Sequence, residues 1–262
     1  FRRVLFRSSY DISGVVGAGL AGLNCARTLQ ESNFDVTVLE KSHRIGGRVA
    51  TDYVDGFQFD HGFQVINPAY SELKRLNLTK KLELKELPKG FEIEISQKPY
   101  LVGDPRTNLK FLQSDFSFQT GSIKEKLSFL RFILSRPRNE TFGRSMISSG
   151  NFYTKVFKGF LDGVFLADSN EVSSEMAHEL LQWFLKGNPG VPARGVAELP
   201  RLLSQDLDIR KYCEVLELRD GFVATNQENY RADVIVIAAD PQSTQKLLQR
   251  PPLQMNASWT WY

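Results

Sequence analysis

Three glycines near the start of the chain have the spacing of a phosphate-binding turn. Gly17, Gly19 and Gly22 stand between an apolar run at 10–16 and a helical stretch at 20–31. Gly17 would permit a tight turn, Gly19 would let a phosphate approach the backbone, and Gly22 would let the helix lie close to the strand. The order of strand, glycine turn and helix therefore predicts a site for a pyrophosphate group.

The backbone of this turn would supply the hydrogen-bond donors. The amides at Ala18, Leu20 and Ala21 would point at the phosphates, where the helix dipole favours negative charge. Glu40 ends a second apolar run at 35–39. A carboxylate at that place accepts hydrogen bonds from both hydroxyls of an adenosine ribose and would repel a 2′-phosphate. Together these residues predict a dinucleotide without a 2′-phosphate.

The first strand departs from the usual pattern. The spacing between Asp11 and Gly17 is one residue longer than the motif normally has, and this stretch includes Ser13 and Gly14. Glycine weakens the interior of a strand and often marks a bulge. We therefore expect either a β-bulge at Ser13-Gly14 or an error in the sequence.

Two further segments distinguish between kinds of dinucleotide. The segment Arg44–Arg48 reads R-x-G-G-R, and Gly56–Gly62 reads G-x-x-F-D-x-G. With the glycine turn and Glu40, this combination resembles the flavin-containing amine oxidase superfamily, which includes protoporphyrinogen oxidases and phytoene desaturases. The resemblance covers essentially all of residues 9–262. It implies FAD as the cofactor.

The resemblance also assigns residues to the cofactor. Gly46 and Gly47 would let the backbone pass close to a flat ligand, and Arg48 would bind the pyrophosphate as a bidentate donor. Gly62 would bring backbone against the flavin ring. In the family, a strand near Val215 contacts the adenine. The predicted cofactor-binding residues are Gly17, Ala18, Gly19, Leu20, Ala21, Gly22, Glu40, Gly46, Gly47, Arg48, Gly62 and Val215.

No catalytic residue can be named from the sequence, and no metal site is predicted. Asp60 and His61 are better suited to shaping their turn than to acid–base catalysis. The three histidines have no metal-ligand spacing with Cys25 and Cys213, and a Gly-x-Ser-x-Gly nucleophile motif is absent. This suits a flavoenzyme, because the cofactor carries the redox chemistry.

The elements that must position these residues predict an α/β fold. We expect a Rossmann-like FAD-binding domain of the glutathione-reductase type, formed by residues 9–66 and 193–250 and interrupted by a mostly helical α+β substrate domain at 67–192. The run 234–239 is typical of a strand buried on both faces of a parallel sheet. Residues 192–199 resemble the family's P-x-G-G-x-x-x-L segment, with Arg194 where one glycine is usual.

The inserted domain has several local signals. Asn67-Pro68 predicts a helix N-cap with proline at the first position, and 91–95 with 99–102 predicts a hairpin. Ser122–Glu125 fits a capping box. The apolar face of the helix that follows would carry Ile123, Leu127, Leu130 and Leu134. Two further stripes comprise Phe152, Val156, Phe157, Phe160 and Leu161, and Met176, Ala177, Leu180, Leu181, Phe184 and Leu185.

Residues 111–165 contain ten phenylalanines. They could line a cavity for a large hydrophobic substrate, or they could form the ordinary core between helices. Because most of them fall on helical stripes, we favour the core interpretation. A turn-rich stretch, 187–192, would end the domain. After it, 213–218 and 222–225 are predicted to pair as strands across a short turn.

Composition limits the classes of partner. The chain has 262 residues, 42% hydrophobic and 24% charged, as is typical of a soluble globular protein. Residues 1–8 contain three arginines and no acid, so the net charge of +3 falls to zero without them. We interpret these residues as a non-native segment; the alternative is an Arg-rich targeting peptide. A neutral chain predicts no nucleic-acid partner.

The remaining expectations concern the cellular compartment of the protein and the two ends of the chain. No apolar run approaches the ~20 residues of a membrane span, and peripheral membrane contact is left open. Cys25 and Cys213 cannot form a disulfide framework, which predicts a reducing, cytoplasmic location. Residues 251–262 are expected to begin a truncated segment of the substrate domain, with a strand at 257–262. We therefore expect an inactive fragment, cut at both ends.

The resulting functional hypothesis is an FAD-dependent oxidoreductase. Hydride would pass to flavin from a C–N or C–C bond of a hydrophobic small-molecule substrate. The alternatives are a non-redox flavin-dependent isomerase of the same superfamily and a flavin-binding fragment without turnover. The sequence leaves the electron acceptor and the oligomeric state open.

Overall fold

The computed structural model describes residues 12–104, 106–112 and 117–254. The predictions for residues 1–8, for Tyr10 and Asp11, for Phe116 and for the strand at 257–262 lie outside the described residues. The described chain forms two compact units. Unit 1 comprises 12–65, 77–84 and 191–254, and unit 2 comprises 66–76 and 85–190.

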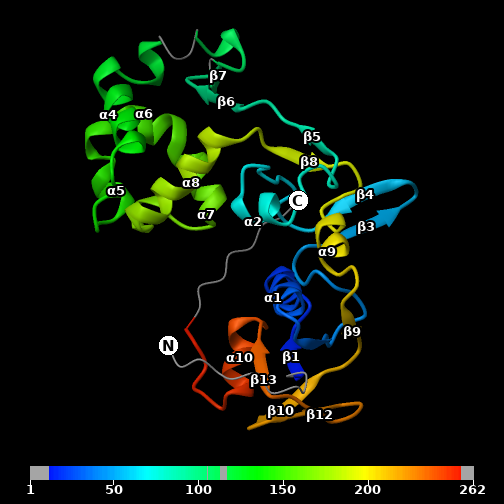
Figure 1. Ribbon diagram of the computed structural model, residues 1–262. Coiled ribbons are helices and arrows are strands. Elements are labelled where there is room, and N and C mark those ends of the chain that lie inside the picture. The colour runs from blue at the N-terminus through cyan, green and yellow to red at the C-terminus, as the bar shows by residue number, and fades with distance from the viewer. Residues whose placement is uncertain (1–11, 105, 113–116, 255–262) are drawn as a thin grey trace. The chain divides into compact units, whose positions relative to one another are not determined.

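A parallel four-stranded sheet forms the centre of unit 1. Its order is β13 (Val234–Ile237), β1 (Ile12–Val16), β2 (Asp35–Leu39) and β9 (Asp208–Arg210). Helix α1 (Leu20–Glu31) joins β1 to β2 and lies against them (Figure 1). The predicted bounds of α1 and β2 are confirmed at both ends.

The predicted bulge in β1 is wrong. Ser13 and Gly14 pair in unbroken register with both neighbouring strands, β2 and β13. A Cβ atom on Gly14 would meet the side chain of Ala232 at 3.6 Å, an ordinary contact. Glycine at this position therefore reflects neither a kink nor a close approach of backbone.

Burial of β13 also differs from the expectation. In the described residues β13 stands at the edge of the sheet, paired only with β1. Val234 is exposed and the rest of the strand is half-buried. A continuous apolar run indicates a strand, but it does not determine the position of that strand in the sheet.

Smaller elements complete unit 1. The predicted pairing of the strands after 213 is confirmed: β10 and β11 are antiparallel, and β12 joins them. β3 and β4 form a second hairpin. The bounds are β3 (Thr51–Val54), β4 (Phe57–Asp60), α9 (Glu198–Leu203), β10 (Val215–Arg219), β11 (Phe222–Thr225), β12 (Tyr230–Arg231) and α10 (Pro241–Leu247).

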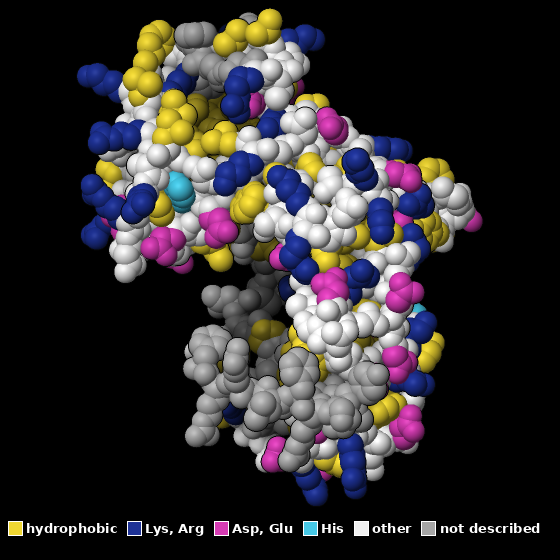
Figure 2. Space-filling model, viewed as in Figure 1, with side chains coloured by type: hydrophobic (Ala, Val, Ile, Leu, Met, Phe, Trp, Pro, Cys, Tyr) yellow, Lys and Arg dark blue, Asp and Glu magenta, His cyan; other side chains and the backbone are white. Residues whose placement is uncertain are grey.

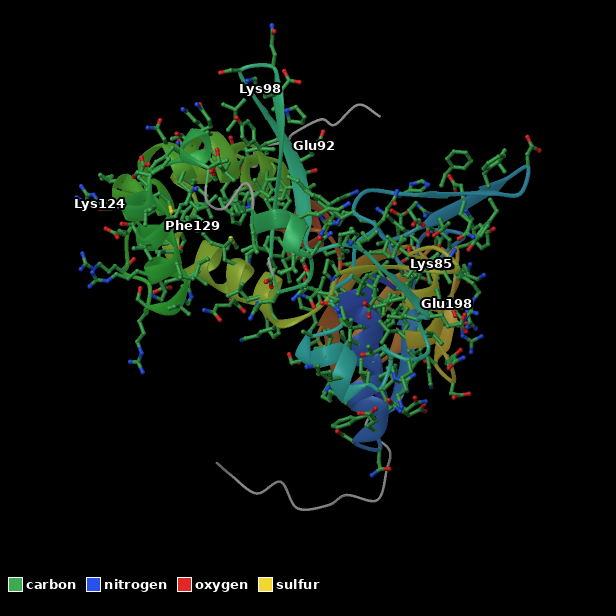
Figure 3. The ribbon with its side chains drawn as sticks, turned by 90° about the horizontal axis from the view of Figure 1, so that it is seen from above. Lys85, Glu92, Lys98, Lys124, Phe129 and Glu198 are labelled. Atoms are coloured by element: carbon green, nitrogen blue, oxygen red, sulfur yellow. The ribbon has the colours of Figure 1, made fainter. Side chains whose placement is uncertain are left out.

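Unit 2 is mostly helical, with one hairpin. Figure 1 shows α4 to α8 gathered together, and the predicted hairpin of β6 and β7 is confirmed (Figure 3). The bounds are α2 (Ser71–Arg75), β6 (Gly90–Ile95), β7 (Lys98–Gly103), η1 (Leu109–Phe111), η2 (Phe118–Thr120), α4 (Ile123–Leu134), α5 (Phe142–Ser145), η3 (Ile147–Ser149), α6 (Gly150–Phe152), η4 (Tyr153–Phe157), α7 (Lys158–Phe165), η5 (Ser169–Glu171) and α8 (Ser174–Lys186). β5 (Leu84–Glu86) and β8 (Gly190–Pro192) form a separate two-stranded sheet.

The core of unit 2 is built from aromatic side chains. Phe129, Phe132 and Phe142 are buried with Tyr153, and further phenylalanines pack against them. The rings of Phe129 and Phe157 stack with centroids 4.4 Å apart. Most of the phenylalanines between 111 and 165 therefore form core, as the favoured interpretation predicts.

The predicted helix that follows Ser122 is confirmed as α4, but its buried face differs from the apolar face that the sequence indicates. Phe129, Phe132 and Ile133 are buried, whereas the four residues of the predicted apolar face are exposed. Asn67 does not cap a helix: its side chain accepts a hydrogen bond from the Ala69 amide and shapes a turn, and α2 begins only at Ser71. Both apolar sets on α4 have helical spacing, so spacing alone could not choose between them.

A π-helical turn, η4, changes the burial pattern of the next stripe. Because a π turn adds a residue to the helical repeat, Tyr153 joins Val156 and Leu161 on the buried side, while Phe160 stays partly exposed. None of the helices in the described residues is long and apolar enough to cross a membrane.

The capping box at Ser122 is confirmed, and it generates a prediction. The Ser122 hydroxyl accepts a hydrogen bond from the Glu125 amide, and the Glu125 carboxylate accepts one from the Ser122 amide. We expect Ser122→Ala to lower the free energy of unfolding by about 1 kcal/mol in urea titrations. Ser128→Ala, in the middle of the same helix, is the control and should cause no such loss. Equal effects of the two substitutions would contradict the capping role.

Candidate functional site

The glycine turn brings β1 and α1 into close contact. A Cβ atom on Gly22 would overlap the carbonyl oxygen of Gly17, so only glycine lets the helix start here. Gly19 is the N-cap residue of α1, and no side chain caps the helix. The position of a Cβ on Gly19 has no neighbouring atom within 4 Å. The start of α1 is therefore open, with its first amides unpaired within the helix.

Glu40 is held beside this turn by two backbone amides. Its carboxylate accepts hydrogen bonds from the Ala18 amide at 2.8 Å and from the Ser42 amide at 2.9 Å. The side chain is buried. Each carboxylate oxygen can accept further bonds. The carboxylate is thus fixed in orientation at the end of β2 and can still bind a ligand.

The R-x-G-G-R segment lies against the same turn. The Gly46 amide donates to the Ala18 carbonyl at 2.8 Å, and Gly46 pairs with Gly19 as an isolated bridge. A Cβ on Gly47 would come within 3.4 Å of the Gly19 Cα. Arg48 follows with an exposed side chain that makes no hydrogen bond or ion pair with the described residues. Its guanidinium group therefore has no protein partner in the part of the chain that the structure describes.

The start of β10 is brought to Glu40 from far along the chain. The Cys213 amide donates to the Glu40 carbonyl at 2.9 Å. Val215 is buried in one cluster with Val16 and Leu39, at the ends of β1 and β2. The structure thus brings together the predicted residues of the turn, Glu40, the glycine pair and Val215. Gly62, with a positive φ of 73°, follows β4 and makes no described contact with them.

Asp60 is occupied in holding a turn. One carboxylate oxygen accepts bonds from the Thr51 hydroxyl at 2.5 Å and from the Val196 amide at 2.9 Å. The Thr51 oxygen in turn accepts from the Ala197 amide at 3.0 Å. His61 forms an exposed pair with Asp52 at 2.7 Å. These contacts support a structural role for Asp60 rather than acid–base chemistry.

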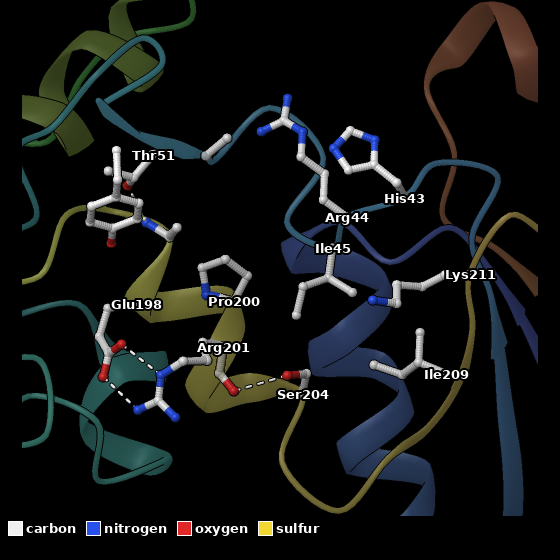
Figure 4. A pocket seen from close by; sticks show the side chains of 13 residues that line it. His43, Arg44, Ile45, Thr51, Glu198, Pro200, Arg201, Ser204, Ile209 and Lys211 are labelled. Carbon is white, nitrogen blue, oxygen red and sulfur yellow. Dashed lines mark hydrogen bonds and ion pairs between the residues drawn. The ribbon is translucent and has the colours of Figure 1, made fainter. Parts of the chain in front are cut away.

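A pocket is lined by residues that include Arg44 and Ile45 of the R-x-G-G-R segment, and Figure 4 shows its lining. Its wall includes Pro200, which a Cβ on Gly46 would meet at 2.9 Å. Arg44, Lys211 and Thr51 also contribute, but none of the predicted cofactor-binding residues does. The pocket is therefore distinct from the glycine turn.

Glu198 is a buried carboxylate in the wall of this pocket. It accepts hydrogen bonds from Arg201 at 2.7 Å and from Arg194 at 2.8 Å. These guanidinium groups, Arg201 foremost, lower the pKa of Glu198 to about 2. Arg194 also pairs with Glu83 at 3.2 Å. Arg194 stands where the family usually has a glycine, and its two ion pairs connect α9 to the segment 77–84.

The family of this chain follows from its match to a known family of proteins. Residues 20–259 match the family described as flavin-containing amine oxidoreductase. This chain belongs to that family. Membership identifies its cofactor as a flavin, FAD, as the sequence predicts.

Relatives in the family share a modest identity with this chain. It is 26% identical over 245 residues to polyamine oxidase 2 of Arabidopsis thaliana, an alignment that covers 86% of this chain and 50% of the relative. The chain thus spans about half the length of that curated relative.

Solved structures show the same mixed α/β fold. An oxidoreductase from Methanosarcina mazei superposes with a TM-score of 0.73 and 19% identity, over 90% of this chain and 60% of the other. A triple mutant of putrescine oxidase with redesigned cofactor binding superposes with a TM-score of 0.66 and 17% identity. This superposition covers 91% of this chain and 60% of the other. At these identities the likeness shows the fold alone.

The ion pairs of Glu198 with Arg194 and Arg201 are not among the features predicted from the sequence. Arg194, Glu198 and Arg201 follow one another at intervals of four and three residues, the spacing at which helical side chains meet. That spacing could have indicated the cluster. The bonds from the Val196 amide to Asp60 and from the Ala197 amide to Thr51 could not have been found in this way, because each joins residues that lie far apart in sequence.

The buried carboxylate generates a prediction about pH. The pKa of Glu198 is lowered from 4.5 in the folded state, so the stabilisation is present above pH 4.5 and is lost as pH falls toward 2. We expect Glu198→Gln to lower the free energy of unfolding by about 2 kcal/mol at neutral pH. The loss is limited to this size because solvent screens the two partly exposed arginines. The cost should shrink as the urea titrations are repeated at lower pH.

Glu83→Gln is the matched control for this series. Glu83 pairs with the same Arg194 but is exposed, so its loss should cost less than about 1 kcal/mol. If the loss of unfolding free energy in Glu198→Gln stayed constant between pH 7 and pH 3, the ionisation of Glu198 would not be coupled to folding.

Proposed function

We propose that unit 1 binds FAD as part of an FAD-dependent oxidoreductase that oxidises the C–N bond of an amine. The observation that carries the proposal is the buried carboxylate of Glu40, held by the Ala18 and Ser42 amides beside the open start of α1. The amine substrate is suggested by the relatives, which include polyamine oxidases.

The geometry of the turn fits a pyrophosphate. The space above Gly19 is free, and the first turn of α1 contains no acidic residue that would repel an anion. The helix dipole favours negative charge at this place. The exposed Arg48 can supply a bidentate contact to a phosphate. We assign the amides of Ala18 to Ala21 and the Arg48 side chain to this role.

Glu40 would hold the adenosine ribose. Its fixed carboxylate can accept hydrogen bonds from the two ribose hydroxyls, whereas a 2′-phosphate would meet a buried negative charge. The Cys213 amide bonds to the Glu40 carbonyl, and the backbone at Val215, two residues further on, would contact the adenine. Gly62 would face the flavin ring, which when bound supplies a two-electron acceptor for hydride.

Unit 2 would contribute the substrate domain, inserted into a Rossmann-like FAD-binding unit 1. Its phenylalanines pack against one another, so they give no support for a large hydrophobic substrate. We therefore keep the substrate class as an amine. The cytoplasmic location also stays a prediction, based on the free cysteines.

A spectroscopic experiment tests this function. The chain, extended to the full length of the protein that contains it, is purified, loaded with FAD and mixed without oxygen with putrescine, with a polyamine or with an amine-free hydrocarbon control. Bleaching of the visible flavin absorbance by an amine alone is expected. Substrate conversion without bleaching would favour a non-redox isomerase, and bound flavin that no amine reduces would contradict the proposed oxidation.

The role of Glu40 generates a prediction of its own. Glu40→Gln keeps the size of the side chain and an acceptor for the Ala18 amide, but it removes the charge. Charge-assisted hydrogen bonds contribute ~1.5–3 kcal/mol each, so the Kd for FAD should rise about tenfold or more. Titration of the apoprotein, followed by quenching of flavin fluorescence, measures it.

The control for this titration is Glu217→Gln, which changes a partly exposed glutamate of unit 1 that pairs with Arg219. It should leave the Kd for FAD unchanged, as should Asp60→Asn to within a few-fold. Equal Kd values for wild type and Glu40→Gln would remove Glu40 from the site.

A further prediction concerns the link between protein and cofactor. Cys25 lies on α1, and Cys213 is buried beside Val16 and Leu39, so neither thiol is near the region assigned to the flavin ring. FAD should therefore be bound without a covalent bond. Acid precipitation of the yellow protein should release the flavin to the supernatant. Flavin that stays in the washed pellet would overturn this assignment.

A further inference from the structure

The pocket in Figure 4 has cationic side chains that the proposed function does not use. Its volume is about 530 Å³, a size typical of sites that hold small organic molecules. All of its lining residues belong to unit 1, and none of them is assigned to FAD. The pocket is therefore a candidate site for a second ligand.

Backbone hydrogen bonds between two neighbouring strand ends bring Lys211 to the pocket. The Glu40 amide, at the end of β2, donates to the Arg210 carbonyl, at the end of β9, at 2.9 Å. The Tyr212 amide donates to the Ser42 carbonyl at 3.1 Å. Lys211 is thus held beside the loop that follows β2. In open α/β sheets, ligands bind outside the carboxyl ends of the parallel strands, and β2 and β9 both end here.

The apolar part of the lining comes from two segments and from α9. Pro200 of α9 packs against Gly46, where a Cβ atom would come within 2.9 Å of the proline ring. Figure 4 shows Pro200 on one side of the pocket and Ile45 and Ile209 on the other. Pro200 is buried, and the two isoleucines are half-buried. A ligand with an apolar group would remove the remaining surface of these side chains from water, which is favourable.

Two positive charges of the lining have no protein partner. Arg44 is half-buried and Lys211 is exposed, and neither side chain forms a hydrogen bond or an ion pair within the part of the chain that the structure describes. Glu198 is the one acid among the lining residues, and Arg194 and Arg201 already compensate its charge. The lining therefore attracts an anion.

These features together favour a small ligand with a phosphate group. Two cations match the double negative charge of a phosphate monoester, and guanidinium and ammonium groups both bind phosphate. On the face that Figure 2 shows, Lys and Arg side chains over the region of α9 and the β3–β4 hairpin are mixed with Asp and Glu side chains. An extended polyanion such as a nucleic acid needs a continuous basic patch. The mixed surface around the pocket suits a small ligand better.

We propose that this pocket binds a phosphate monoester whose organic group is apolar. The phosphate contacts the side chains of Arg44 and Lys211, and the apolar group lies against Ile45, Pro200 and Ile209. The site is separate from the glycine turn, and binding there requires neither FAD nor the oxidation of an amine. The inference therefore goes beyond the proposed function and does not depend on it.

Calorimetric titration with phenyl phosphate tests the proposal. The sample is the full-length protein that contains this chain, so that a pocket closed by the rest of the protein is detected as a loss of binding. Phenyl phosphate should bind. Inorganic phosphate, which lacks the ring, and phenol, which lacks the charge, should each bind about tenfold more weakly or not at all. Arg44→Gln and Lys211→Gln should each raise the Kd for phenyl phosphate about tenfold, because each removes a charge-assisted hydrogen bond.

Two further variants locate the probe. Arg210→Gln removes an equal charge next to Lys211, but Arg210 pairs with Asp208 and does not line the pocket. This variant should bind phenyl phosphate as wild type does. Arg48→Gln removes the cation assigned to the pyrophosphate and should also leave the affinity for phenyl phosphate unchanged. Circular dichroism confirms that each variant is folded.

Four results would overturn the proposal. The first is the absence of phenyl phosphate binding by the full-length wild-type protein. The second is equal binding of phenyl phosphate and inorganic phosphate, which would exclude an apolar subsite. The third is an equal loss in Arg210→Gln and Lys211→Gln, which would indicate non-specific attraction. The fourth is a loss in Arg48→Gln as large as that in Lys211→Gln, which would place the probe at the glycine turn.

Discussion

The buried carboxylate of Glu40 joins the parts of unit 1 that a nucleotide site needs. It stands at the end of β2, accepts the Ala18 amide from the glycine turn, and accepts the Ser42 amide from the segment that leads to Gly46 and Gly47. A buried charge is tolerated only where hydrogen bonds compensate its desolvation. The orientation of the turn and of this segment is therefore tied to one side chain.

The backbone of the glycine turn lies in close contact with the backbone at Gly46 and Gly47. This contact is possible because Glu40 holds both segments in place. The Gly46 amide bonds to the Ala18 carbonyl, and Gly47 lies against Gly19. Side chains at these places would separate the two segments or fill the space in front of α1. The glycines thus leave the first amides of α1 open, and the exposed Arg48 follows directly after Gly47 in the chain. Chemistry beyond binding would come from the flavin and not from these residues.

The sequence predicted the β1–α1–β2 unit well because each signal there is local: the glycine spacing, the strand pattern and the terminal glutamate. It failed where two local interpretations compete. Helix α4 has apolar residues on opposite sides, and only the phenylalanine side packs inward. Gly14 suggested a bulge, yet the register is unbroken. The Asp60–Val196 contact joins distant segments and leaves no trace in spacing.

Glu40 would select the dinucleotide through the two hydroxyls of its adenosine ribose. The most direct measurement is competition: FAD bound to the wild-type protein is displaced with ADP and, separately, with the analogue that carries an additional phosphate on the ribose 2′-oxygen. The account predicts that ADP displaces FAD and that the 2′-phosphorylated analogue does so far more weakly, because its phosphate would meet the buried carboxylate. Equal displacement by the two nucleotides, or tighter binding of the 2′-phosphorylated one, would contradict it.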